Sequence, residues 1–154
     1  MNKVNCKDFK LKILDTCKNE ILDKLTIIEK ELKYLHYDIA EDTKSSAGDK
    51  FETSREMANA EVDKLQSQVF TMNKSMTMLN TIPLEPKPDI GLGSLFRTEN
   101  SWIFISVSLG QLKIETENIL VISPSAPLAK QFIGKIANDE VSFNGNSYFI
   151  KHVC

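Results

Sequence analysis

The chain has 154 residues, of which 42% are hydrophobic and 26% are charged, and its formal net charge is −2. This length suits one or two small domains, and the composition is that of a folded protein rather than a disordered one. The charge excludes a strongly basic protein that binds nucleic acid by charge alone, although it leaves a local basic face open.

The sequence lacks the apolar segments that membrane insertion requires. Its longest apolar stretch, around residues 102–107, is far shorter than the roughly 20 residues of a membrane span. The N-terminus carries no apolar signal core, so we expect a cytoplasmic protein with no membrane partner.

The cysteines and histidines form no motif along the sequence. Cys6, Cys17 and Cys154 are odd in number and far apart, with no His or Cys at metal-ligand spacing, so we expect reduced thiols. His36 and His152 are isolated in the same way, and we expect surface or packing roles for them.

Two segments carry apolar residues at the spacings of 3 and 4 that a coiled coil requires. In the first segment these are Leu14, Cys17, Ile21, Leu25, Ile28, Leu32, Leu35 and Ile39. In the second they are Ala58, Val62, Leu65, Val69, Met72, Met76 and Leu79. Residues 41–48 lose this period and gather small residues, which favours a turn. The sequence therefore predicts an antiparallel coiled-coil hairpin over residues 1–81. Lysines along its first helix, Lys10 among them, alternate with acids, which favours a solvated surface over an RNA-binding face.

A second domain follows a connector. Residues 82–88 contain three prolines, which forbid a regular helix and favour an extended linker. Residues 89–154 then contain short β-like runs at 92–98, 102–108, 111–115, 119–122, 140–143 and 147–153. One helix is expected over residues 126–133, entered through Pro127 and closed by Gly134, and Asn144-Gly145-Asn146 suits a hairpin turn. The fold class is α+β, a helical hairpin followed by a small, mostly antiparallel sheet with one helix. Its expected core aromatics are Trp102, Phe104, Phe132, Phe143, Tyr148 and Phe149.

Asp49 and Glu52 lie three residues apart at the predicted hairpin tip, within Gly48-Asp49-Lys50-Phe51-Glu52. Two interpretations are open. The spacing is that of a capping box, with Asp49 as the N-cap and Glu52 at the third helical position. It also suits two carboxylates that direct a metal ion. A pair at the end of a rod has no pocket of its own, so metal chemistry there would take place inside a partner.

Two motifs carry a resemblance to a known family. Residues 122–135, Ile-Ser-Pro-Ser-Ala-Pro-Leu-Ala-Lys-Gln-Phe-Ile-Gly-Lys, resemble the C-terminal domain of the bacterial Gre transcript cleavage factors (GreA/GreB-like), as do Asp139-Glu140-Val141 and the strand at 148–150. Residues 90–94 resemble the opening strand of that domain. Gly48-Asp49-x-x-Glu52 preserves the frame that Gre factors carry at the hairpin tip. The order and spacing agree over nearly the whole chain.

The resemblance implies an FKBP-like C-terminal domain that binds RNA polymerase and a coiled coil that enters its secondary channel. Asp49 and Glu52 would help to hold a second Mg²⁺ and a water, and the polymerase would cleave the 3′ end of a backtracked nascent RNA. The chain would have no cofactor or turnover of its own, and we expect a monomer. The implied polymerase-binding residues are Ser123, Pro127, Leu128, Lys130, Phe132 and Gly134.

The tip also departs from the family pattern. Gre factors usually continue it with a Ser-Glu-Asn-Ala-Glu run, whereas this chain has Phe51 between the acids and Arg55 close behind them. One alternative is therefore a regulator that occupies the channel without stimulating cleavage. A prolyl isomerase or chaperone, suggested by the FKBP-like architecture alone, and a general coiled-coil interaction protein are two further alternatives.

Overall fold

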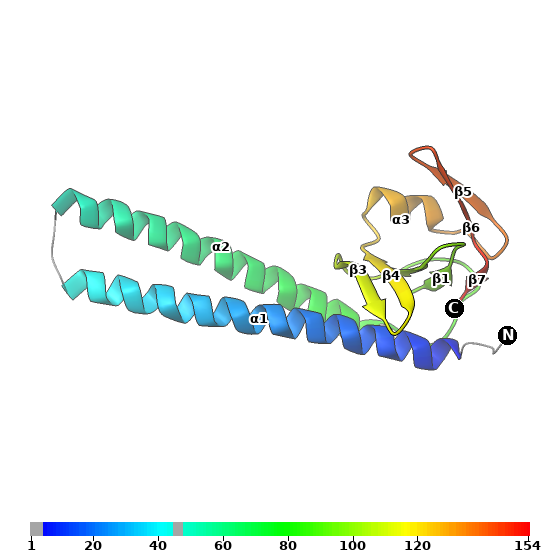
Figure 1. Cartoon of the computed structure of the whole chain (residues 1–154), viewed down its shortest axis with the longest axis horizontal. Coiled ribbons are helices and arrows are strands. Elements are labelled where there is room, and N and C mark those ends of the chain that lie inside the picture. The colour runs from blue at the N-terminus through cyan, green and yellow to red at the C-terminus, as the bar shows by residue number, and fades with distance from the viewer. Residues whose placement is uncertain (1–4, 45–47) are drawn as a thin grey trace. The chain divides into compact units, whose positions relative to one another are not determined.

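The computed structural model describes the backbone of residues 5–44 and 48–154, and their side chains apart from those of residues 42–44 and 48–51. Helices α1 (Cys6–Lys44) and α2 (Gly48–Thr81) run antiparallel as a hairpin (Figure 1). In the described residues, seven short strands and one six-residue helix, α3 (Pro127–Phe132), follow. The predicted fold class, a helical hairpin followed by a small sheet domain with one helix, is confirmed.

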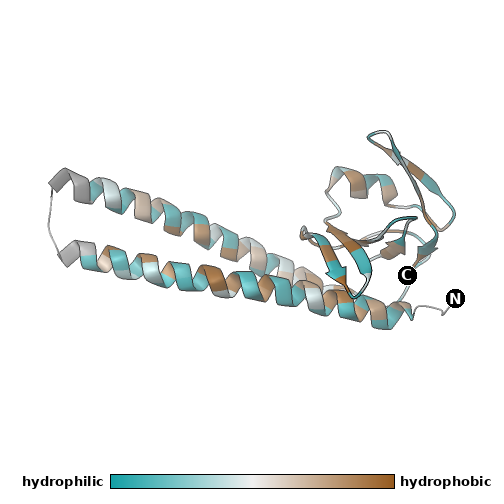
Figure 2. Cartoon of the chain, viewed as in Figure 1, coloured by the Kyte–Doolittle hydropathy of each residue, from teal (hydrophilic) through white to brown (hydrophobic). Residues whose placement is uncertain are grey.

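The hairpin buries the seam that the sequence predicts. All the seam residues are buried or half-buried, with Leu25 9% and Leu65 4% exposed. Hydrophobic positions recur along both helices among hydrophilic ones (Figure 2). Burial decreases toward the tip, where Leu35, Ile39 and Ala58 are only half-buried. The apolar stripe therefore holds the two helices together, as expected for an amphipathic pair.

The chain divides into two compact units. One is the hairpin segment Lys18–Met76, and the other joins Met1–Cys17 to Thr77–Cys154. The first turns of α1 therefore belong to the same unit as the sheet.

The second unit contains two sheets. The larger has strand order β3-β4-β2-β1-β7, in which β2 and β4 pair parallel and the other neighbours pair antiparallel. The smaller is the antiparallel pair of β5 and β6. The strands are β1 (Leu95–Arg97), β2 (Trp102–Ile105), β3 (Gly110–Ile114), β4 (Glu117–Ile122), β5 (Glu140–Phe143), β6 (Asn146–Phe149) and β7 (His152–Val153).

Both local signals of the second domain are confirmed. Asn144 and Gly145 have φ of 49° and 77° between β5 and β6, as a tight hairpin turn requires. Helix α3 begins with a proline at its N-terminus, and Gly134 has φ of 86° just after its end. The predicted strand over 147–153 is interrupted, because Ile150 between β6 and β7 turns into the core.

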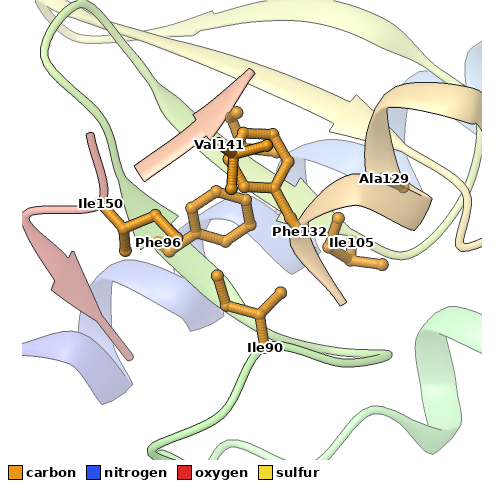
Figure 3. Close-up of a cluster of buried hydrophobic side chains, with 8 residues drawn as sticks. Ile90, Phe96, Ile105, Ala129, Phe132, Val141 and Ile150 are labelled. Carbon is orange, nitrogen blue, oxygen red and sulfur yellow. The ribbon is translucent and has the colours of Figure 1, made fainter. Parts of the chain in front are cut away.

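One face of the larger sheet packs against α3. Phe96, Ile103 and Ile105 form a cluster with Phe132, in which the Phe96 and Phe132 ring centroids lie 4.8 Å apart (Figure 3). Tyr148 packs on the other side of Phe132, at 5.6 Å. This cluster is the main core of the domain, and Phe96 is a member that the sequence interpretation missed.

The opposite face packs against the first turns of α1. Successive side chains of a strand point to opposite faces, so Trp102 and Phe104 of β2 lie on the side away from Ile103 and Ile105. Phe9 of α1 meets the Trp102 ring edge-on at 5.1 Å. All four residues of β2 are buried, because both faces of the sheet are covered. Of the other expected core aromatics, Phe143 and Phe149 are only half-buried.

Two expectations for single residues are wrong. Lys10 is not on a solvated surface, because it is 2% exposed between the helix and the sheet domain. Burial lowers the pKa of its ammonium group. Repulsion from Lys87 lowers this pKa further, and the attraction of Glu85 raises it.

The prediction of reduced thiols is also wrong for two cysteines, since Cys6 and Cys154 form a disulfide. Cys17 is buried and forms no disulfide.

Among the described residues, no helix is both long enough and apolar enough to cross a membrane.

The core cluster predicts a large stability difference between two adjacent residues. Phe132 is fully buried, whereas Ile133 is 43% exposed. Phe132→Ala should lower the free energy of unfolding by about 3–5 kcal/mol, and Ile133→Ala by less than about 0.5 kcal/mol. Urea denaturation followed by Trp102 fluorescence, which reports on this unit, measures both. Equal losses for the two variants would contradict the assignment of the core.

Candidate functional site

The predicted metal-directing acids lie at the start of α2, Asp49 in its first turn and Glu52 as its fifth residue. This helix begins at Gly48, so the backbone of Asp49 and of Glu52 is helical. Positions three apart on a helix lie on the same face. The side chain of Asp49 is outside the described residues, and that of Glu52 is exposed. The backbone therefore brings the two positions together at the closed end of the hairpin.

This geometry changes the capping interpretation of the tip. Because α2 already includes Gly48, Asp49 stands inside the first turn and not at the N-cap. Acids in the first turn still stabilise a helix, since the N-terminal end of its dipole is positive and its first N–H groups have no partner within the helix. Asp49 thus suits this place without any metal, and a function for it needs a reason beyond helix stability.

The chemistry of the donors fits a hard divalent cation. Mg²⁺ prefers carboxylate oxygens and water in an octahedral arrangement. Among the side chains that the structure describes, Glu52 belongs to no group of three His, Cys, Asp or Glu ligands. Two carboxylates would leave most of the six positions to water or to another molecule. By themselves, two carboxylates supply only part of the ligand set that Mg²⁺ requires.

The predicted partner-binding residues gather around α3. Pro127 and Lys130 on the helix and Gly134 after it are exposed, and Ser123 and Leu128 are half-buried. The Ser123 and Ser125 hydroxyls lie 2.9 Å apart before the helix. Phe132 is fully buried in the core. Its side chain therefore packs beneath the exposed residues of α3 and is not available to a partner.

Three exposed apolar residues of this unit were missed. Leu92, Ile133 and Ile136 are 50%, 43% and 50% exposed. Ile133 and Ile136 follow α3 directly, whereas Leu92 lines a pocket with Lys10 and Cys154. No periodic pattern marked these residues, since they stand in irregular segments. We call the exposed residues Pro127, Lys130, Ile133, Gly134 and Ile136 the α3 surface.

Comparisons with known proteins returned solved structures only. No protein-family model and no curated protein matches the chain. GreA factor homolog 1 (Gfh1) of Thermus thermophilus is 14% identical, with a TM-score of 0.36 over 89% of this chain and 94% of that one. Gfh1 of Thermus aquaticus is 15% identical, with a TM-score of 0.35 over 88% and 92%. A structure described as the transcription factor Gfh1 is 14% identical, with a TM-score of 0.37 over 87% and 89%. Values this low leave the function to be inferred from the residues of this chain.

The exposure of Glu52 predicts that this residue contributes little to folding. Glu52→Gln should change the free energy of unfolding by less than about 0.5 kcal/mol, because the side chain is exposed and keeps its shape. Urea denaturation followed by circular dichroism at 222 nm measures the change. A loss of more than about 2 kcal/mol would show that Glu52 is a structural residue of the hairpin.

Proposed function

We propose that this chain binds RNA polymerase and uses its hairpin to bring Asp49 and Glu52 to the polymerase active centre, where they stimulate cleavage of backtracked RNA. The observation that carries this proposal is the Gly48-Asp49-x-x-Glu52 frame at the start of α2, at the closed end of a helical hairpin. The resemblance of residues 122–135 to the Gre C-terminal domain supports it independently.

The dimensions of the hairpin suit entry into a channel. Residues 18–44 of α1 and residues 48–76 of α2 make up its two arms. At a rise of 1.5 Å per residue, each arm is about 40 Å long, and each helix is about 10 Å wide with its side chains. Such a hairpin has the reach to carry two carboxylates into an interior that a globular domain cannot enter.

The two acids would act by completing a site that the partner begins. When Mg²⁺ is held between carboxylates and the RNA, it lowers the pKa of a bound water and stabilises the charge that develops on the phosphate. Asp49 and Glu52 would supply negative oxygens on one side of that site, and neither has to act as a proton carrier.

The α3 surface is the proposed docking site on the polymerase. It combines exposed apolar side chains, Ile133 and Ile136 among them, with the charge of Lys130. An apolar patch with a polar rim is common at protein–protein contacts.

Arg55 favours the alternative function. It is exposed and stands three residues after Glu52 on the same helix, within reach of an ion pair with that carboxylate. A guanidinium group there would compete with a metal ion for Glu52. In that case the chain would bind polymerase and occupy its channel without stimulating cleavage.

The test is Mg²⁺-dependent RNA cleavage in a backtracked elongation complex assembled with the cognate polymerase. The intact chain should accelerate release of the 3′ fragment, and Asp49→Asn/Glu52→Gln should reduce the acceleration by at least about 10- to 100-fold, because ligands to the second Mg²⁺ are lost. Polymerase binding by the double variant, measured in the same samples, should not change.

The matched control is Glu61→Gln/Asp63→Asn, which removes the same charge from α2 about 17 Å along the helix from the tip acids. This control should keep full stimulation. Binding without stimulation by the intact chain would establish the channel-occupying regulator instead, and Arg55→Ala would then be expected to restore cleavage. Absence of polymerase binding would contradict both functions.

A further inference from the structure

Cys6, His152 and Cys154 come together in space although 148 residues separate the two cysteines. Their sulfur and nitrogen atoms all lie within 4.8 Å of one another. The cysteine sulfurs form a disulfide, and the Cα atoms are 5.5 Å apart, well inside the range for disulfides. None of these three residues belongs to the hairpin tip or to the α3 surface, so the function proposed above does not use the cluster.

The fold holds each cysteine in place by contacts other than the disulfide. Strand β7 pairs with β1, and the Cys154 N–H donates to the Leu95 carbonyl at 2.7 Å. Cys6 is the first residue of α1, whose next turn packs Phe9 against Trp102. The two thiols therefore stay close when the bond is broken, which makes its formation and cleavage readily reversible.

His152 supplies an imidazole next to the more accessible sulfur. Its Nε2 lies 3.2 Å from the Cys6 Sγ. Cys6 is half-buried, whereas Cys154 is 1% exposed. An imidazole at this distance can accept the thiol proton and stabilise the thiolate, which is the reactive form of cysteine. Cys6 is thus the attacking thiol and Cys154 its partner.

Cys154 lines a small pocket together with Lys10, Lys87 and Glu85. Lys87 is exposed and supplies a positive charge, whereas burial lowers the pKa of Lys10. A positive charge beside Cys154 stabilises its thiolate, which also makes this sulfur a better leaving group when the disulfide is reduced. The two cysteine sulfurs are bonded to each other, so the cluster is a disulfide and not a set of free metal ligands.

We propose that Cys6, Cys154 and His152 form a redox-active thiol site that exchanges with small-molecule disulfides such as glutathione disulfide. The Cys6 thiol gives its proton to His152, and its thiolate attacks one sulfur of the small disulfide. That S–S bond breaks, and one small thiol leaves with a proton. The Cys154 thiol then loses its proton to His152, and its thiolate attacks the Cys6 sulfur. The bond between Cys6 and the small thiol breaks, the second small thiol leaves with that proton, and the protein disulfide forms. In total, two electrons pass from the protein to the small disulfide. In the reverse reaction, two small thiols reduce the Cys6–Cys154 disulfide.

The chemistry does not depend on the proposed function, but the cell compartment bears on its use. Disulfides are rare in reducing compartments, and those that occur there in mesophiles are usually transient, catalytic or redox-sensing. A chain that works beside RNA polymerase would therefore use this bond reversibly. The bond joins the first turn of α1 to strand β7, so its state determines whether these two elements are linked covalently.

The test equilibrates the full chain in buffers of glutathione and glutathione disulfide and stops the exchange with acid. The remaining free thiols are then labelled with a maleimide and counted by mass spectrometry. We expect Cys6 and Cys154 to lose reactivity together in one two-electron transition, while Cys17 stays outside it. Cys17→Ser should leave the transition unchanged. Cys154→Ser should instead accumulate a mixed disulfide between Cys6 and glutathione, whereas Cys6→Ser should form little of it, because Cys154 is only 1% exposed. Circular dichroism checks that both variants fold.

The role of His152 has a separate readout. His152→Asn should slow disulfide formation at neutral pH by about tenfold or more, with the helical content unchanged. An unchanged rate would remove His152 from the site. Two results of the glutathione titration would overturn the whole proposal: persistent mixed disulfides on the intact chain, or no loss of Cys6 and Cys154 reactivity at any buffer ratio. It would also be overturned if the reduced protein retained one equivalent of zinc that Cys6→Ser did not retain.

Discussion

The sheet of the second unit has two apolar faces, and the rest of the structure depends on how each face is covered. Helix α3 covers one face through Phe132, and the first turns of α1 cover the other through Phe9. Without α1, Trp102 and Phe104 would be exposed to water at a cost of about 1.5–3 kcal/mol for each large apolar side chain. The domain is therefore built from both ends of the chain, and α1 contributes to both compact units.

The same packing of α1 against the sheet also determines where the Cys6, His152 and Cys154 cluster lies. Because the first turn of α1 must lie near the sheet that ends in β7, Cys6 comes to lie beside Cys154 and His152. The buried ammonium of Lys10 has the same origin, since it stands one turn after Cys6 on the helix face that meets the sheet domain. Features that are 148 residues apart in the sequence thus share one cause in the fold.

Local patterns predicted local structure well. The steps of 3 and 4 gave the hairpin seam, and Pro127, Gly134 and Asn144-Gly145 marked the ends of α3 and the turn between β5 and β6. These signals act through backbone preferences and a repeating face, both of which can be read within a few residues. The exposed Ile133 and Ile136, the buried Lys10 and the Cys6–Cys154 pair depend on which distant segments meet. No spacing along the chain contains that information.

The sequence predicted where the two acids of the candidate site lie, but it could not predict the other ligands of a metal ion there. The sequence placed Asp49 and Glu52 at the turn between two helices, and α2 begins there. Whether the two carboxylates meet a metal ion inside the polymerase is a matter of the partner's ligands, which the sequence of this chain does not contain. A cryo-electron microscopy structure of the chain bound to a backtracked polymerase elongation complex tests this most directly. The account predicts the hairpin tip beside the catalytic Mg²⁺, with the Asp49 and Glu52 carboxylates facing the RNA phosphate. A bound chain whose tip lies outside the channel, in solvent, would contradict it.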